Sequence, residues 1–79
     1  MSKISFEDFA KQFKDELDIQ TVGFEILDLK DIPEYDSIGK IKASLVIESA
    51  FGFEIKIEVL SVEKNLHSLW HYCEQNSKS

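Results

Sequence analysis

The sequence predicts a single all-α domain, and two features carry this prediction. Apolar residues recur at three- and four-residue steps over residues 6–17 and again over residues 66–73, which is the spacing of one helix face. Between these segments, an aspartate in a helix-capping position precedes residues 37–51, where apolar residues fill two adjacent helical strips. A chain of 79 residues leaves room for one hydrophobic core, so we expect one domain over residues 1–79.

The composition is that of a folded protein, with 43% apolar and 30% charged residues. Cys73 is the only cysteine, which excludes a disulfide within the monomer and any zinc ribbon built from paired cysteines. The chain has no apolar run of about 18 residues, and its first residues lack the apolar stretch of a signal peptide. We therefore expect a cytoplasmic protein that has no membrane partner.

The chain is acidic, with a net charge of −6, and all nine of its basic residues are lysines. Proteins that bind nucleic acids present basic patches in which arginine contacts phosphate, so this balance argues against DNA or RNA as a partner. All of the excess negative charge lies before Ser37. Residues 15–36 alone hold eight acids and a single base, Lys30.

The first helix is expected over residues 6–17, with an apolar face formed by Phe6, Phe9, Ala10, Phe13 and Leu17. Ser5 lies in the N-cap position with Asp8 three residues later, which resembles a capping box with a shorter acid. Ile4 can pack on Phe9 as a hydrophobic staple.

Residues 18–36 lose the helical period and form a long connection that contains Gly23 and Pro33. A connection of this length is uncommon in so small a domain and is usually functional or partly structured. Seven apolar residues are expected to anchor it: Ile19, Val22, Phe24, Ile26, Leu27, Leu29 and Ile32.

The second helix is expected from Ser37 to Phe51, with Asp36 as its N-cap and Gly52 as its stop. Local propensity also allows a hairpin, because residues 44–47 and 53–60 are β-branched and partly alternating. The alternative fold is therefore an α/β domain with a two-stranded core. The apolar residues of the helix form two strips, one of Ile38, Ile41 and Leu45 and one of Ala43, Val46, Ile47 and Ala50.

The last helix is expected to follow Asn65, a favourable N-cap, and a polar tail from about residue 75 is expected to fray. Cys73 lies on its apolar face, which favours a buried reduced thiol over a reactive one. The expected core of the whole domain contains Phe6, Phe9, Phe13, Ile47, Phe51, Leu66, Leu69 and Trp70.

No pattern in the chain predicts a catalytic or metal site. His67 and His71 are four residues apart on the last helix, but a structural zinc needs four ligands, so we expect two partly exposed histidines. Ser37 lacks the glycine two positions before it that the nucleophile elbow of a serine hydrolase needs. The three glycines are too far apart to form a phosphate-binding loop.

One constellation does resemble a known family. Asp36-Ser37-Ile38 opens the second helix, and Phe51-Gly52-Phe53-Glu54-Ile55 begins fourteen residues after Ser37. This arrangement resembles the acyl carrier protein family, in which Asp-Ser-Leu opens the second helix and a Phe-Gly-Ile-Glu-Ile-like segment follows at the same interval. The run Ile32-Pro33-Glu34-Tyr35 is similar to the Leu-Pro-Glu-Trp of some stand-alone carriers, and the resemblance covers nearly the whole chain.

The resemblance implies a right-handed four-helix bundle with a short third helix near Ile57 to Val62, and it favours helix over hairpin. It also implies that Ser37, next to the motif residue Asp36, carries covalent 4′-phosphopantetheine transferred from coenzyme A by a phosphopantetheinyl transferase. The thiol of this group would hold acyl or aminoacyl thioesters for acyl-activating and acyl-transfer enzymes. The protein would be a monomeric carrier for fatty-acid or polyketide chemistry and would have no catalytic activity of its own.

Partners of such carriers bind the second helix, where typical members present acidic side chains. Here Glu48 is the only acid on that helix, and lysines stand on its first turns, which predicts dedicated partners in a specialised pathway. The alternative function is a protein-interaction module of the same fold in which Ser37 is never modified. Six residues are expected to contact partners: Ile38, Lys40, Ile41, Lys42, Leu45 and Glu48.

Overall fold

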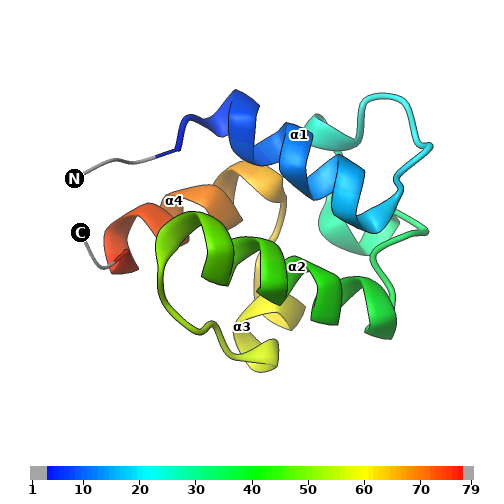
Figure 1. Ribbon diagram of the computed structural model, residues 1–79. Coiled ribbons are helices and arrows are strands. Elements are labelled where there is room, and N and C mark those ends of the chain that lie inside the picture. The colour runs from blue at the N-terminus through cyan, green and yellow to red at the C-terminus, as the bar shows by residue number, and fades with distance from the viewer. Residues whose placement is uncertain (1–3, 78–79) are drawn as a thin grey trace.

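Four α-helices make up most of the computed structural model, which describes residues 4–77 (Figure 1). They are α1 (Phe6–Leu17), α2 (Ser37–Phe51), α3 (Ile57–Val62) and α4 (Leu66–Asn76). Within these residues there is no strand, and an isolated bridge joins Asp28 to Asn65. The all-α prediction is confirmed, and the hairpin alternative is wrong.

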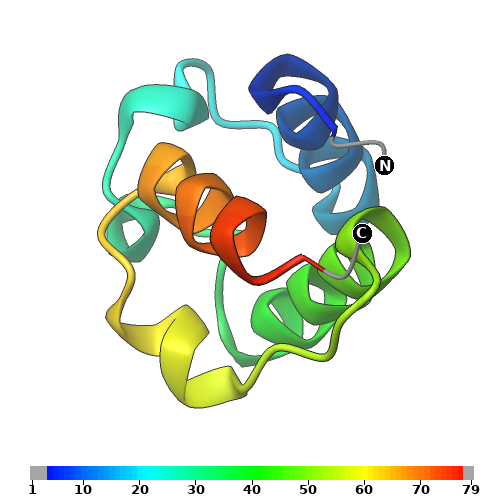
Figure 2. The ribbon, with the colours of Figure 1, turned by 90° about the vertical axis from the view of Figure 1, so that its left-hand side faces the viewer.

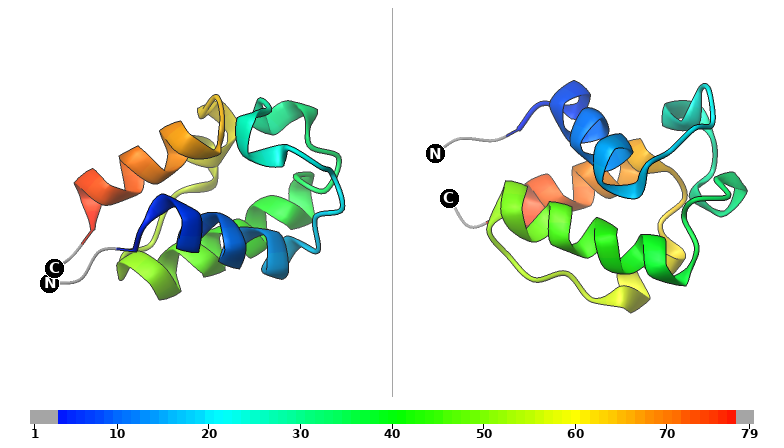
Figure 3. Two further views of the ribbon diagram at one scale, coloured as in Figure 1. Left: turned by 90° about the horizontal axis from the view of Figure 1, so that it is seen from above. Right: turned by 45° about the vertical axis from the view of Figure 1, so that its right-hand side comes forward.

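The helices enclose one core. α1 packs against α2 and α4, and α2 also packs against α3 and α4 (Figure 2). The start of α1 and the end of α4 lie at the same end of the molecule, and the connection from α1 to α2 crosses the other end (Figure 3). The largest side chains buried in the core are Phe9, Phe13, Ile19, Leu29, Ile32, Ile47, Leu60, Leu66, Leu69 and Cys73.

Helix capping follows the local sequence. The Ser5 hydroxyl accepts a hydrogen bond from the backbone N–H of Asp8 at 3.1 Å, and Ile4 packs against the core. The Asn65 side chain accepts from the N–H of Ser68 at 2.8 Å in a complete capping box. α2 ends at Phe51, because Gly52 takes the left-handed conformation with φ 76°. The predicted N-cap residues of all three long helices are thus confirmed, including that of α2 described below, but the capping box expected at Ser5 is only half formed, with no hydrogen bond from the Ser5 N–H to Asp8.

Tertiary packing overrides β-propensity in the middle of the chain. Val46 and Ile47 are buried against the core from α2, and Leu60 is buried from α3. A hairpin would place alternate residues on opposite faces, whereas α2 brings Ala43, Val46 and Ile47 onto one face by their three- and four-residue spacing. The short third helix has the bounds that the resemblance implied.

The connection between α1 and α2 contains two 3₁₀ turns, η1 (Phe24–Ile26) and η2 (Leu29–Asp31). Phe24 is buried and its ring stacks on Phe13 at 6.4 Å. The prediction of seven anchors was wrong at two positions, because Val22 and Ile26 are 95% and 85% exposed. Phe24, which lies between them, makes the contact with the core, so these two side chains point to solvent.

Phe6 and Trp70 are half-buried and do not lie in the core interior, which corrects the predicted core list. Their rings meet edge to face at 5.8 Å near the start of α1, and the His67 ring lies tilted against both. The indole N–H of Trp70 donates to the Ile4 carbonyl at 3.0 Å. The need to satisfy this polar group explains why Trp70 lies at the edge of the core. The predicted fraying begins too early, since α4 extends through Asn76; residues 78 and 79 lie outside the described part.

Candidate functional site at the start of α2

Ser37 is the first residue of α2, and its side chain is exposed. Asp36 caps the helix, because its carboxylate accepts a hydrogen bond from the N–H of Gly39 at 2.8 Å, and its carbonyl accepts from Lys40 at 2.8 Å. The amides of Ser37 and Ile38 precede the first intrahelical hydrogen bond, so they stand free at the positive end of the helix. A hydroxyl on this turn is accessible and held by a rigid element.

Two residues fix the chain just before Ser37. The carboxylate of Glu34 accepts hydrogen bonds from the backbone N–H of Gln20 at 3.0 Å and from the hydroxyl of Thr21 at 3.1 Å. The Gln20 hydrogen bond holds the pKa of Glu34 below its usual range. These contacts join the two ends of the α1–α2 connection.

Tyr35 is the second of these residues. Its ring is buried beside Phe13 at 5.9 Å, and its hydroxyl donates to the carbonyl of Leu60 at the end of α3, at 2.7 Å. Burial, followed by the negative charges of Glu63 and Cys73, raises the pKa of Tyr35 well above its usual range. Ser37 therefore stands two residues after a buried anchor.

The outer face of α2 carries an apolar strip next to Ser37. Ile38, Ile41 and Leu45 are 64%, 55% and 54% exposed, while the neighbouring strip of Ala43, Val46 and Ile47 is buried. Residues three and four apart are neighbours on a helix surface, so the exposed strip runs along α2 from the Ser37 turn. The expectation that these three residues stay exposed is confirmed. We call them the α2 apolar strip.

The charged residues predicted beside the strip differ in their exposure. Lys40 is half-buried, and its ammonium lies 5.6 Å from the centre of the Tyr35 ring, a cation–π position. Lys42 is half-buried near Glu34 and Asp36, with which it lines a shallow hollow, and Glu48 is exposed. The structure thus places the eight predicted site residues on α2 and its cap. The two lysines differ in their neighbours, because Lys40 lies beside Tyr35 and Lys42 lies near the two carboxylates.

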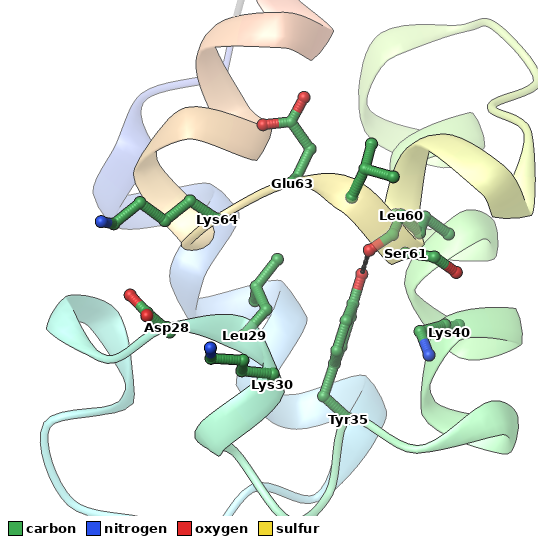
Figure 4. Close-up of a pocket in the computed structure, with 10 residues that line it drawn as sticks. Asp28, Leu29, Lys30, Tyr35, Lys40, Leu60, Ser61, Glu63 and Lys64 are labelled. Atoms are coloured by element: carbon green, nitrogen blue, oxygen red, sulfur yellow. Dashed lines mark hydrogen bonds between the residues drawn. The ribbon is translucent and has the colours of Figure 1, made fainter.

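A cavity of about 390 Å³ lies one helical turn from Ser37 (Figure 4). Lys40 of α2 lines it together with Tyr35 and with the segments around Leu29 and around Leu60 to Lys64. The volume is within the range of small-molecule pockets. No pattern in the sequence indicates this cavity, because its three walls come from segments that are distant along the chain.

The other candidate groups that the sequence offers are Cys73 and the two histidines of α4. Cys73 is buried, and burial, with the charge of Glu63, raises its pKa to about 12, so the thiol is unreactive at neutral pH.

His67 and His71 are exposed, and in residues 4–77 no three metal-ligating side chains gather into a possible metal site. None of the helices in the described range is long and apolar enough to cross a membrane.

Comparisons of the chain with models of known protein families, with curated proteins and with solved structures find no match.

Proposed function

We propose that the protein is an acyl carrier of the acyl-carrier-protein type, with 4′-phosphopantetheine attached to the Ser37 hydroxyl. The observation that carries the proposal is the position of this residue. Ser37 is an exposed serine on the first turn of a 15-residue helix, between a capping aspartate and the α2 apolar strip. The four-helix arrangement with a six-residue third helix supports the same fold.

The site suits the chemistry of attachment. The Ser37 oxygen would bond to the phosphorus that carries pantetheine in coenzyme A, the phosphate–phosphate bond would break, and adenosine bisphosphate would leave. The hydroxyl proton would pass to a base of the transferase. The resulting phosphodiester anion is favoured by the free amides at the helix start, although the carboxylate of Asp36 partly opposes it.

The α2 apolar strip supplies a recognition surface for the partner enzymes. Three exposed branched side chains on one helix face are a typical helix docking surface, and they adjoin the attachment residue. Glu34 and Tyr35 hold the helix start in place, so the attachment residue and the strip keep a fixed relative position. The carrier contributes reach and recognition, and its partners contribute the reaction.

Intact-mass measurement tests the proposal. The purified protein is incubated with coenzyme A and several phosphopantetheinyl transferases. Wild type and Ser49→Ala, a change at an exposed serine of the same helix, are expected to gain the mass of one phosphopantetheine. Ser37→Ala is expected to gain none. If wild type stays unmodified with every transferase, the carrier proposal is wrong and the interaction module of the same fold takes its place.

A further inference from the structure

The edge of α1 that faces α2 is acidic. The two helices lie side by side and run in opposite directions (Figure 1, Figure 3). A shallow hollow of about 250 Å³ lies between them, with Asp15 and Glu16 of α1 on one wall and Leu45 of α2 on the other. Both acids are exposed. One end of the α2 apolar strip is therefore bordered by two carboxylates that come from another helix.

The other end of the strip, at Ile38, is also bordered by carboxylates. The hollow next to it is lined by Ile38, by Lys42 and by three acids, Asp18, Glu34 and Asp36. A hydrogen bond from a backbone N–H holds the pKa of Glu34 below its usual range, so this group stays ionised at neutral pH. The three carboxylates together outweigh the positive charge of Lys42.

The acids and the lysines of α1 lie on different sides of the helix. Lys11 and Lys14 line another hollow, beside Phe24 of η1. Residues three apart share a helix face, so these lysines lie toward η1, whereas Asp15 and Glu16 lie toward α2. Figure 2 shows η1 and α2 on opposite sides of α4. The lysines of α1 therefore do not border the strip.

The strip needs a flanking surface to hold a protein partner. It comprises three side chains, whereas a standard protein interface covers roughly 800 Å² on each partner. We call Asp15, Glu16 and Asp18 the α1 acidic edge. It is continuous with the strip, because Leu45 and Ile38 line the same hollows as these acids. The strip and the edge together form an apolar surface with negative charge along one side.

We infer that a partner protein docks across α1 and α2, with apolar side chains on the α2 apolar strip and lysine or arginine side chains against the α1 acidic edge. Opposite charges across an interface fix its register and speed association. Anionic membranes and nucleic acids do not fit, because the acids repel them. The inference rests on the proposed function for the identity of the partners, which are the enzymes that act on the arm. The docking surface itself does not require the arm.

The attachment reaction tests the charged part of this surface. The probe is a phosphopantetheinyl transferase that modifies wild type, and kcat and KM are measured with the protein as the varied substrate. Asp15→Asn with Glu16→Gln is expected to raise KM roughly fivefold at low salt with little change in kcat, because rim charges act on association. The difference should shrink at high salt. Negative charge is disfavoured in the last turn of a helix, so this variant should stay folded.

Two further variants separate this edge from other effects. The control Glu25→Gln with Glu54→Gln also removes two exposed acids, from η1 and from the segment after α2, and should leave KM near that of wild type. Leu45→Ala is expected to raise KM equally at low and high salt, because it removes apolar contact area. If the control pair raises KM as much as the edge pair, net charge is responsible and the inference is wrong. If the edge pair behaves as wild type, the inference is wrong while the carrier function stands.

A peptide probe tests the surface without the attachment reaction. A helical peptide with leucine along one face and lysine beside it is titrated into the unmodified protein, and two-dimensional NMR records the backbone amide signals. The largest shifts are expected at residues 15–18 and 38–49, and they should be smaller in the edge pair and with a peptide that has glutamate in place of lysine. Shifts centred on η1 or α3 would contradict the inference. If no transferase modifies Ser37, the carrier proposal is wrong and this titration alone decides the inference.

Discussion

The backbone carbonyl of Glu34 lies directly against the α-carbon of Gly39. A Cβ on residue 39 would overlap the Glu34 carbonyl oxygen and approach its carbonyl carbon to 3.1 Å. Only glycine at residue 39 leaves room for the Glu34 carbonyl to lie against the first turn of α2. Glu34 itself is three residues before Ser37, where the helix begins. The helix cost of a glycine at this position is about 1 kcal/mol relative to alanine, and the close approach accounts for it.

We predict that Gly39→Ala destabilises the protein, although alanine favours helix. The neighbour that must move is backbone, so the overlap is expected to outweigh the gain in helix propensity and to leave a net loss of about 1 to 3 kcal/mol. Chemical denaturation measures this. Ser49→Ala, at an exposed position of the same helix, is the control and should change stability by a few tenths of a kcal/mol. Equal stability of the two variants would show that the overlap is relieved without cost.

Phe13 is the most connected aromatic residue of the core. Its side chain is fully buried and its ring lies within 6.4 Å of the rings of Phe9, Phe24 and Tyr35. Phe13→Ala is expected to lower the free energy of unfolding by roughly 3 to 5 kcal/mol, a large share of what so small a domain has. Thermal melting followed by circular dichroism measures the loss. A cooperative melt near the wild-type temperature would place the core elsewhere.

Stability is expected to fall at alkaline pH through Cys73. Burial raises the pKa of this thiol to about 12 in the folded protein, from 9.0 in the unfolded chain. Below pH 9 both states keep the proton, so the effect on stability is absent there. Between pH 9 and 12 only the unfolded state loses it, and the free energy of unfolding drops by up to about 1.4 kcal/mol per pH unit.

Cys73→Ala separates this effect from general alkaline denaturation. The variant loses some packing at all pH values, but its stability should decline less steeply than that of wild type between pH 9 and 12. Urea titrations at several pH values give both slopes. The raised pKa of the buried Tyr35 acts in the same direction in both proteins and contributes to the decline that remains. Identical slopes in the two proteins would exclude Cys73 as the cause.

Partner recognition is expected to depend on Lys40 and Lys42. If the protein is a carrier, these lysines oppose enzymes that place cations against an acidic second helix. Fatty-acid synthesis enzymes should use the loaded protein poorly, and Lys40→Glu with Lys42→Glu should raise kcat/KM at low salt and lose influence at high salt. Efficient use of wild type, unchanged by the double substitution, would show that both lysines are unimportant for recognition. Lys56→Glu, on another part of the surface, is the control.

The helices were predictable because their signals are local. Ser5, Asp36 and Asn65 cap from within their own segments, and Gly52 ends α2 through its own backbone conformation. The exposure of the α2 apolar strip also follows from a count of the apolar residues, because α2 carries more of them than one core face can bury.

The rest depends on contacts between distant residues. Val22 and Ile26 look like core residues in the sequence, and only the way the turn at Phe24 meets α1 decides that they face solvent. The hydrogen bonds that Glu34 accepts from residues 20 and 21, and the one that Tyr35 donates to Leu60, join positions at least 13 residues apart. No local pattern encodes these pairings, so neither the anchoring of Glu34 and Tyr35 before α2 nor the cavity beside them could be predicted.

The attachment site itself is tested most directly by locating the added group on the chain. Wild-type protein incubated with coenzyme A and a phosphopantetheinyl transferase is digested, and tandem mass spectrometry assigns the modified residue. We expect one phosphopantetheine on Ser37 and none on the other serines of α2, Ser44 and Ser49. A group on any other residue, or an unmodified peptide around Ser37 with every transferase tried, would contradict it.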